Sequence, residues 1–122
     1  MSKFVIRAVP SGIKFDLKAT NGQVIATSEV YLTRASCLKG IESVRKNAPL
    51  APTENLTEPD YTPRTNPKFE MYQDRSGGYR FRLKARNGAI IAVSESYTTR
   101  SSCENGIDSV RKNADLAEIY EE

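Results

Sequence analysis

The sequence predicts an α+β fold: two tandem β-β-β-α(-β) repeats, related by a pseudo-two-fold axis, that share one antiparallel sheet with both helices packed on one face. The first observation is internal repetition, since residues 18–51 and 84–117 align at a constant offset of 66 and are identical at 23 of 34 positions. The second is that apolar and polar residues alternate in the first part of each repeat, which is typical of half-buried strands. The third is a change to helical spacing of the apolar residues in the second part.

The strands are clearest in the second repeat. Basic and apolar side chains alternate along residues 79–85, which predicts a strand whose core side includes Tyr79 and Phe81. An Asn-Gly pair follows at 87–88 and favours a type I′ hairpin turn, in which both central residues have positive φ. We therefore expect residues 89–95 to return as the partner strand.

This turn fixes the predicted pairing of the two strands. Leu83 then lies opposite Ala92 on the core side, and Lys84 lies opposite Ile91 on the outer side. The Asn-Gly pair at 21–22 gives the same register in the first repeat.

A helix follows the hairpin in each repeat. Its buried stripe consists of Cys37, Gly40, Ile41, Val44 and Ala48 in the first repeat, and of Cys103, Gly106, Ile107, Val110 and Ala114 in the second. A glycine inside a helix costs about 1 kcal/mol relative to alanine. Its repetition at the same place indicates that each helix packs closely on the sheet.

The ends of the two helices also carry recognisable residues. The candidate N-caps are Thr33 or Ser36, and Thr99 or Ser102. At the other end, Asn47 and Asn113 are candidates for a residue in the left-handed conformation.

Each repeat is completed by further strands. Residues 4–8 and 69–73 predict an earlier strand that makes a three-stranded meander, and residues 117–121 predict a short last strand. Its counterpart in the first repeat has Pro52 where the second has Glu118, so we expect that strand to be weaker or confined to an edge.

The repeats define the expected domain organisation. Residues 1–51 form the first repeat, residues 52–67 a proline-rich connector and residues 68–122 the second repeat. We expect the two repeats to form one compact unit, because the chain is too short for two independent cores.

One long motif recurs in both repeats: Asn-Gly, then Ser-Glu-x-Tyr, then Ser-Cys-x-x-Gly-Ile, then Ser-Val-Arg-Lys-Asn-Ala at 43–48 and 109–114. This pattern resembles the YegP-like family of small bacterial and archaeal proteins, to which no function is assigned. The resemblance covers both repeats, and the second matches best. It implies a unit of three strands, one helix and one strand, and two such units that join into one sheet by exchanging their last strands. It supplies no catalytic residues.

Composition limits the possible functions. The 122 residues are 39% apolar and 27% charged, as in a globular domain, and include no histidine. The absence of histidine excludes histidine triads, histidine general bases and histidine metal sites. The net charge is +3, and the excess lies in residues 1–66, which hold nine basic and six acidic side chains. A dedicated DNA-binding domain usually has a stronger bias.

We expect a cytoplasmic protein that does not enter the membrane. No apolar run approaches the roughly 18 residues of a membrane span, and the N-terminus lacks the apolar stretch of a signal peptide. Cys37 and Cys103 fall on the buried helix stripes, so we interpret them as small buried side chains rather than nucleophiles or redox partners. We expect no cofactor and no metal, because the sequence has neither a phosphate-binding loop nor ligands at metal spacing.

The first candidate site is a basic stripe formed by Arg80, Arg82, Lys84 and Arg86. Alternate residues of a strand lie about 6.6 Å apart on one face, which approximates the phosphate spacing of a nucleic-acid strand. However, no aromatic residue for base stacking is expected on this face, and Asp16 interrupts the equivalent stripe in the first repeat. A solvated outer face is the simpler interpretation.

The second candidate site is a polar set at the predicted helix starts: Thr33, Arg34, Ser36, Thr99, Arg100 and Ser102. Hydroxyls and an arginine at a helix N-terminus can hold a small anion or a group of a partner. Helix capping explains the hydroxyls without any ligand.

These observations favour a non-catalytic binding or accessory module. We expect a protein partner, and a monomer, because the tandem repeat supplies its own second half. The alternative is weak, salt-sensitive nucleic-acid binding through the basic stripe. An enzyme ranks third, because the usual catalytic groups are missing or fall on buried positions.

Overall fold

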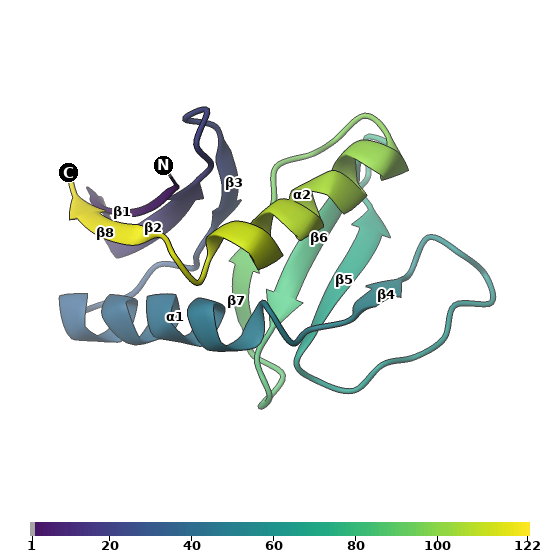
Figure 1. Ribbon diagram of the computed structural model, residues 1–122, viewed down its shortest axis with the longest axis horizontal. Coiled ribbons are helices and arrows are strands. Elements are labelled where there is room, and N and C mark those ends of the chain that lie inside the picture. Colours follow the sequence, from purple (N-terminus) through teal and green to yellow (C-terminus); the bar gives the residue numbers. More distant parts are fainter. Residues whose placement is uncertain (1) are drawn as a thin grey trace.

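The computed structural model describes residues 2–122 as one mixed sheet of eight strands with two helices on one face (Figure 1). The strands are β1 (Lys3–Val9), β2 (Gly12–Lys18), β3 (Val24–Thr27), β4 (Thr53–Asn55), β5 (Lys68–Gln73), β6 (Tyr79–Lys84), β7 (Ile90–Val93) and β8 (Glu118–Glu121). The helices are α1 (Arg34–Asn47) and α2 (Arg100–Asn113). The strand order in the sheet is β4-β5-β6-β7-β3-β2-β1-β8.

The two repeats exchange their last strands. β4 leaves the first repeat and pairs with β5, whereas β8 leaves the second repeat and pairs with β1. The two meanders meet in the middle, where Thr27 of β3 pairs with Val93 of β7. The strand exchange and the single sheet implied by the family resemblance are therefore confirmed.

The sequence predicts an antiparallel sheet, but the observed sheet is mixed. The six inner strands are antiparallel, but β4 and β8 run parallel to their neighbours. Each of these strands follows a helix, which carries the chain back across the sheet instead of reversing it in a hairpin. β4 has only three residues and lies at an edge, directly after Pro52, as expected for a strand that a proline restricts.

The hairpin turns differ from the predicted type I′ turns. Among residues 2–122 only glycines have positive φ, with 85° at both Gly22 and Gly88. The Gly88 N–H donates to the Ala85 carbonyl, and the Ala85 N–H donates to the Ala89 carbonyl, both at 2.9 Å. Each hairpin therefore has a three-residue loop that ends in a glycine bulge. Asn87 keeps negative φ, and its Oδ1 accepts the Ala89 N–H at 3.0 Å.

This turn changes the register beside it. Leu83 pairs with Ala92, as predicted, but a bulge makes Lys84 pair with Ile90 and not with Ile91. The extra residue Ile91 is buried in the hydrophobic core instead of lying on the outer face.

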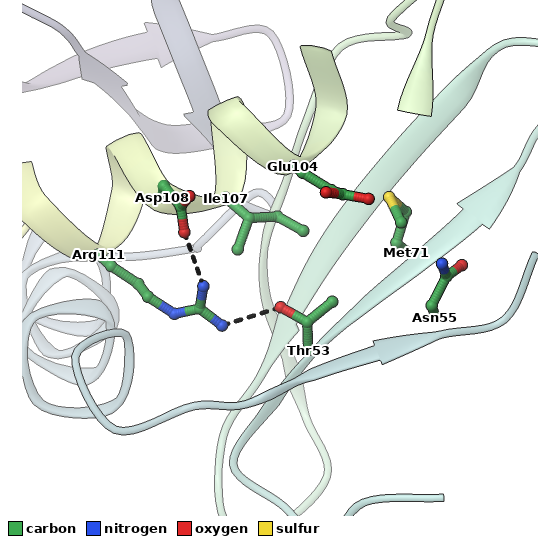
Figure 2. A pocket seen from close by; sticks show the side chains of 7 residues that line it. All are labelled: Thr53, Asn55, Met71, Glu104, Ile107, Asp108 and Arg111. Atoms are coloured by element: carbon green, nitrogen blue, oxygen red, sulfur yellow. Dashed lines mark hydrogen bonds and ion pairs between the residues drawn. The ribbon is translucent and has the colours of Figure 1, made fainter. Parts of the chain in front are cut away.

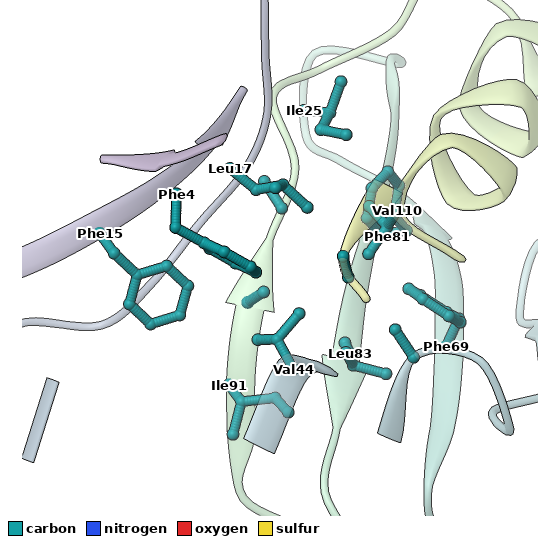
Figure 3. Packing of buried hydrophobic residues seen from close by; sticks show 14 of the residues in the cluster. Phe4, Phe15, Leu17, Ile25, Val44, Phe69, Phe81, Leu83, Ile91 and Val110 are labelled. Carbon is teal, nitrogen blue, oxygen red and sulfur yellow. The ribbon is translucent and has the colours of Figure 1, made fainter. Parts of the chain in front are cut away.

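The hydrophobic core fills the space between the sheet and the two helices (Figure 3). Both predicted helix stripes are buried in it. Two edge-to-face phenylalanine pairs occupy equivalent places in the two repeats. The ring centroids of Phe4 and Phe15 are 5.6 Å apart, and those of Phe69 and Phe81 are 5.8 Å apart. One core therefore joins both repeats.

The helices start where predicted but end differently. Thr33 and Thr99 are the N-caps, and their hydroxyl oxygens accept the N–H groups of Ser36 and Ser102. Asn47 is not left-handed, because the helical conformation continues through Ala48. The amides of Asn47 and Asn113 instead donate to carbonyls one turn earlier, at 2.8 Å. Neither helix of residues 2–122 has the length and hydropathy needed to cross a bilayer.

Candidate binding site

The predicted basic stripe lies on the outer face of the sheet, but carboxylates from neighbouring strands neutralise much of it. Arg82 Nε lies 2.6 Å from Glu70 Oε1, and Lys84 Nζ lies 3.3 Å from the same oxygen. Lys68 adds ion pairs to Glu70 and to Glu54. Burial alone raises the pKa of Glu70, but the hydrogen bonds and charges of Arg82 and Lys84 outweigh burial and hold this pKa below its ordinary value.

Arg80 is also paired within the chain. Its Nε lies 3.0 Å from Asp74 Oδ2. Asp74 accepts further hydrogen bonds from Ser76, Ser96 and the Gly78 N–H. The bonds from Ser76, Ser96 and Arg80 hold the pKa of Asp74 well below its usual range. Arg80 is thus part of a closed network at the β5–β6 turn.

Arg86 does not belong to the stripe. It lies in the turn after β6 and lines a pocket against α1 together with Lys39 and Lys46. The structure therefore brings Arg80, Arg82 and Lys84 together on one face, but separates Arg86 from them.

An aromatic residue that the sequence did not predict lies on this face. Tyr72 of β5 pairs with Arg80, and the Arg82 guanidinium lies over its ring, 4.6 Å from the centroid. The expectation of a face without aromatic side chains is therefore wrong. The alternation of Glu70 and Tyr72 along residues 68–73 was the available signal.

The polar set at the helix starts divides into two separate groups, one on each repeat. Thr33 and Thr99 act as helix caps. Arg34 makes two hydrogen bonds to Glu121 of β8, at 2.6 and 2.7 Å. Arg100 bonds to Glu58 after β4, at 2.8 Å. Each arginine therefore bonds to a residue of an exchanged strand or its loop.

The two thiols are held in unreactive surroundings. Cys37 and Cys103 are free and fully buried. Burial, followed by the nearby Glu104 carboxylate, raises the pKa of Cys103 to about 11. Burial also raises the pKa of Cys37. At neutral pH both side chains are protonated thiols, which are weak nucleophiles.

A groove between α2 and β4 is the clearest concave site outside these networks (Figure 2). Its volume is about 350 Å³, and its lining consists of Thr53, Asn55, Met71, Glu104, Ile107, Asp108 and Arg111. Figure 2 shows the side chains of α2 on one wall, Thr53 and Asn55 of β4 on the other, and Glu104 facing Met71 between them. The groove thus lies between the second repeat and the strand that it receives from the first.

The charges in the groove are only partly satisfied by the chain. Arg111 donates to Asp108 Oδ1 at 3.0 Å and to Thr53 Oγ1 at 2.9 Å, and it also donates to the Ala51 carbonyl. Glu104, by contrast, is exposed and forms no ion pair with any residue in 2–122. The groove therefore offers an unpaired carboxylate above an apolar floor.

Two positions of this lining are apolar at the equivalent place in the first repeat. The residue equivalent to Glu104 is Leu38, and the residue equivalent to Thr53 is Ile119. Both Leu38 and Ile119 pack against the core. The pseudo-symmetry of the fold is thus broken at two positions that line one groove, Glu104 on α2 and Thr53 on β4.

The edge of β4 runs beside this groove and is open at Thr53, whereas the Asn55 carbonyl accepts the Glu58 N–H of the following loop at 3.4 Å. The Pro52 carbonyl accepts the Phe69 N–H, and the Leu56 N–H donates to the Met71 carbonyl, both at 2.8 Å. Because alternate residues of a parallel strand bond to the same neighbour, the backbone N–H and C=O of Thr53 face away from β5. Thr53 therefore combines a side chain in the groove with backbone groups at a free sheet edge.

This groove is not among the sites predicted from the sequence. A comparison of the aligned repeats, position by position, would have shown that Glu104 stands where the first repeat has Leu38. That Thr53 and Glu104 line the same groove depends on the strand exchange, which places β4 beside α2.

Comparisons with known proteins agree with this architecture. Residues 12–55 and 74–121 match the domain of unknown function DUF1508. A UPF0339 protein YegP of Yersinia pestis is 42% identical over 99 residues, which cover 81% of this chain and 75% of that protein. YegP of Escherichia coli O157:H7 is 40% identical over 103 residues, which cover 84% of this chain and 80% of that protein.

One relative has the length of a single repeat. A UPF0339 protein of Treponema denticola is 56% identical over 54 residues, which cover 44% of this chain and 93% of that protein.

Two solved structures share the fold. The solution NMR structure of yegP from E. coli, described as a protein of unknown function, has a TM-score of 0.79 and 34% sequence identity, covering 98% of this chain and 91% of that one. The solution NMR structure of the UPF0339 protein SO3888 from Shewanella oneidensis has a TM-score of 0.80 and 30% identity, covering 98% of this chain and 90% of that one.

Proposed function

The chain belongs to the DUF1508 family of unknown function, and within it we propose a non-catalytic protein-binding module that acts in the cytoplasm as a monomer. Its site is the groove between α2 and β4. The partner is an extended polypeptide segment that carries a cationic side chain.

The observation that carries this proposal is the broken symmetry of the groove. A position that only stabilises the fold would suit an apolar residue in both repeats, as Leu38 and Ile119 do in the first. In the second repeat Glu104 and Thr53 replace these contacts with polar groups. Such replacement loses the apolar burial that Leu38 and Ile119 contribute in the first repeat, and a binding role offsets this loss.

The free edge of β4 suits an extended partner. A peptide that adds to a sheet edge gains main-chain hydrogen bonds, and its alternate side chains enter neighbouring pockets. The outward backbone groups of Thr53 can form the main-chain hydrogen bonds, and the groove beside Glu104 can receive a side chain of the peptide. Thr53 and Asn55 also line a second cavity of about 210 Å³, toward the loop after β4.

The charge of the groove selects the partner's side chain. Glu104 is unpaired, and Asp108 shares its charge with Arg111. A lysine or arginine side chain can lie along the groove and reach the Glu104 carboxylate with its charged end. An acidic side chain at the same place would be repelled.

The surroundings of the other polar groups favour binding over catalysis. The two thiols have raised pKa values, and the carboxylates Glu70 and Asp74 are held as ion-pair acceptors. The same ion pairs disfavour nucleic acid as the partner, because Arg80, Arg82 and Lys84 would have to exchange these carboxylates for phosphates.

The test is a titration of isotope-labelled protein, followed by amide chemical shifts. The probe is a peptide of about eight residues, the length of an ordinary strand, that alternates valine and threonine around a central lysine. Matched peptides carry glutamine or glutamate at that position. We expect saturable shifts in β4, β5 and α2 with the lysine peptide, weaker shifts with glutamine and none with glutamate.

The control variant is Thr53→Ile combined with Glu104→Leu, which installs the residues of the first repeat. It should fold, since the first repeat packs Leu38 and Ile119 against the core at the equivalent positions, and it should lose roughly tenfold or more in affinity. Asn105→Ala, on the exposed side of α2, should bind normally. Binding that the double variant leaves unchanged would refute the site. Shifts produced only by single-stranded RNA, at Arg82 and Lys84, would replace the proposal with nucleic-acid binding.

A further inference from the structure

A second, basic pocket lies between an element of the first repeat and a turn of the second. It occupies about 370 Å³ between the C-terminal half of α1 and the turn that joins β6 to β7, two segments that Figure 1 shows close to one another. Lys39 and Lys46 of α1 line one side, and Arg86 and Asn87 of the turn line the other. Neither repeat could form this pocket alone.

The cations of this pocket are unpaired. Among residues 2–122, none of Lys39, Lys46 and Arg86 forms an ion pair with a carboxylate. The one carboxylate in the lining, Glu42, lies 2.6 Å from Arg45 and is neutralised by it. This distinguishes the pocket from the outer face of the sheet, where Arg80, Arg82 and Lys84 are all paired.

The fold does not require this concentration of charge. At the equivalent place in the second repeat, Lys39 is replaced by Asn105 and Arg86 by Thr20, and only the lysine at 46 has a basic counterpart, Lys112. A lysine in the last turn of a helix is explained by the helix dipole. Lys39 and Arg86 have no such explanation.

The balance of charge favours an anion. The C-terminus of α1 contributes the equivalent of about half a negative charge, against three full positive charges in the lining. The Asn87 Oδ1 accepts the Ala89 N–H at 3.0 Å, so the side-chain NH2 remains available as a neutral donor. The lining thus offers N–H donors from two ammonium groups, one guanidinium and one amide. These donors can bond to a group that has several oxygens at tetrahedral angles.

We infer that this pocket binds the phosphoryl group of a small ligand, held by Lys39, Lys46 and Arg86. The site is independent of the groove between α2 and β4, and a ligand there would bridge the two repeats. Because α1 and the β6–β7 turn belong to different repeats, binding would also stabilise the folded chain against separation of its halves.

The experiment uses the full chain in a phosphate-free buffer at constant ionic strength. Pyrophosphate, inorganic phosphate and AMP are titrated separately, with acetate as the carboxylate comparison, and amide shifts are recorded. Saturable shifts at residues 39–47 and 85–88 with a phosphoryl probe, but not with acetate, are expected. Inorganic phosphate and AMP distinguish the bare phosphoryl group from a nucleotide.

Two double variants with the same net charge distinguish binding at this pocket from non-specific electrostatic attraction of the anion to the protein. Lys39→Asn with Arg86→Thr copies the second repeat and should weaken binding roughly tenfold or more. Lys14→Gln with Lys18→Gln removes two charges from the outer face of the first repeat and should leave the affinity within about twofold. Equal losses in both variants, or shifts that never saturate with any phosphoryl probe, would overturn the inference.

Discussion

The Tyr97 hydroxyl lies directly against Gly106 of α2. A Cβ at Gly106 would lie 2.4 Å from Tyr97 Oη and 3.1 Å from the Phe81 ring. The same arrangement recurs in the first repeat, where a Cβ at Gly40 would lie 2.2 Å from Tyr31 Oη. Each helical glycine thus makes room for a tyrosine from the strand-to-helix connection, in addition to the close packing on the sheet that the sequence predicts.

Gly106→Ala and Gly106→Leu should therefore destabilise the fold. Alanine gains about 1 kcal/mol in helix propensity, but overpacking of this kind costs about 1–3 kcal/mol, and leucine should cost more. Urea unfolding measures the difference. The exposed neighbour Asn105→Ala should be neutral or stabilising. In a Tyr97→Ala background, Gly106→Ala should lose its penalty. A raised melting temperature for either Gly106 variant alone would contradict this account.

Ser94 should contribute to stability through one buried hydrogen bond. Its Oγ accepts the Phe81 N–H at 2.9 Å and donates to the Glu95 carbonyl at 2.8 Å. Ser94→Ala leaves the Phe81 N–H without a partner and should cost about 1–3 kcal/mol. Equilibrium unfolding in urea measures this loss. Ser101→Ala, at an exposed position of α2, is the control, and an equal change in both variants would count against the buried bond.

Glu70 should make stability depend on pH. Its pKa is below the ordinary value of 4.5 in the folded chain, so its stabilising contribution is complete above that value and is lost as the pH falls through the folded pKa. Glu70→Gln should be less stable by about 2 kcal/mol at pH 7, because Arg82 and Lys84 lose their carboxylate.

The measurement for Glu70 is the free energy of unfolding between pH 7 and pH 3. The difference between the wild type and Glu70→Gln should begin to shrink near pH 4.5, the ordinary value, and should vanish below the folded pKa. Glu104→Gln, which removes a carboxylate without an ion pair, is the matched control. A constant difference between wild type and Glu70→Gln across this range would show that Glu70 does not titrate as described.

The second repeat alone, residues 68–122, should form a homodimer. In the full chain β5 pairs with β4, and β8 pairs with β1, so the isolated repeat has an unpaired β5 edge and an unpaired last strand. Exchange of β8 between two copies satisfies both. Sedimentation equilibrium should give twice the fragment mass, whereas the full chain should sediment as a monomer. A folded monomeric fragment would contradict the exchange as the source of stability.

The local features of the fold could be predicted from the sequence because their causes are local. The caps at Thr33 and Thr99 and the buried helix stripes follow from spacing within one helix. The predicted turn type was wrong. The Asn87 side chain accepts the Ala89 N–H, so Asn87 itself does not need the left-handed conformation. That one difference moved Ile91 from the outer face into the core.

The candidate sites could not be predicted equally well, because their properties depend on neighbours that are distant in sequence. The strand that holds Arg82 is basic, but Glu70 of the neighbouring strand pairs with Arg82 and Lys84 and neutralises them. Arg86 continues the alternation in the sequence, yet the turn carries it to α1. The groove beside Glu104 exists only because β4 crosses to the other repeat.

The strand exchange also determines how the chain can reach its native state. β1 acquires its outer neighbour from residues 118–121 and β5 acquires its outer neighbour from residues 53–55, so neither half can close its sheet until the other is present. The loops that must be closed are long, and their entropic cost is met before the contacts form. Folding should therefore be slow for a chain of this size and all-or-none, and a nascent chain that has not yet produced β8 would present the bare edge of β1 to any other strand nearby.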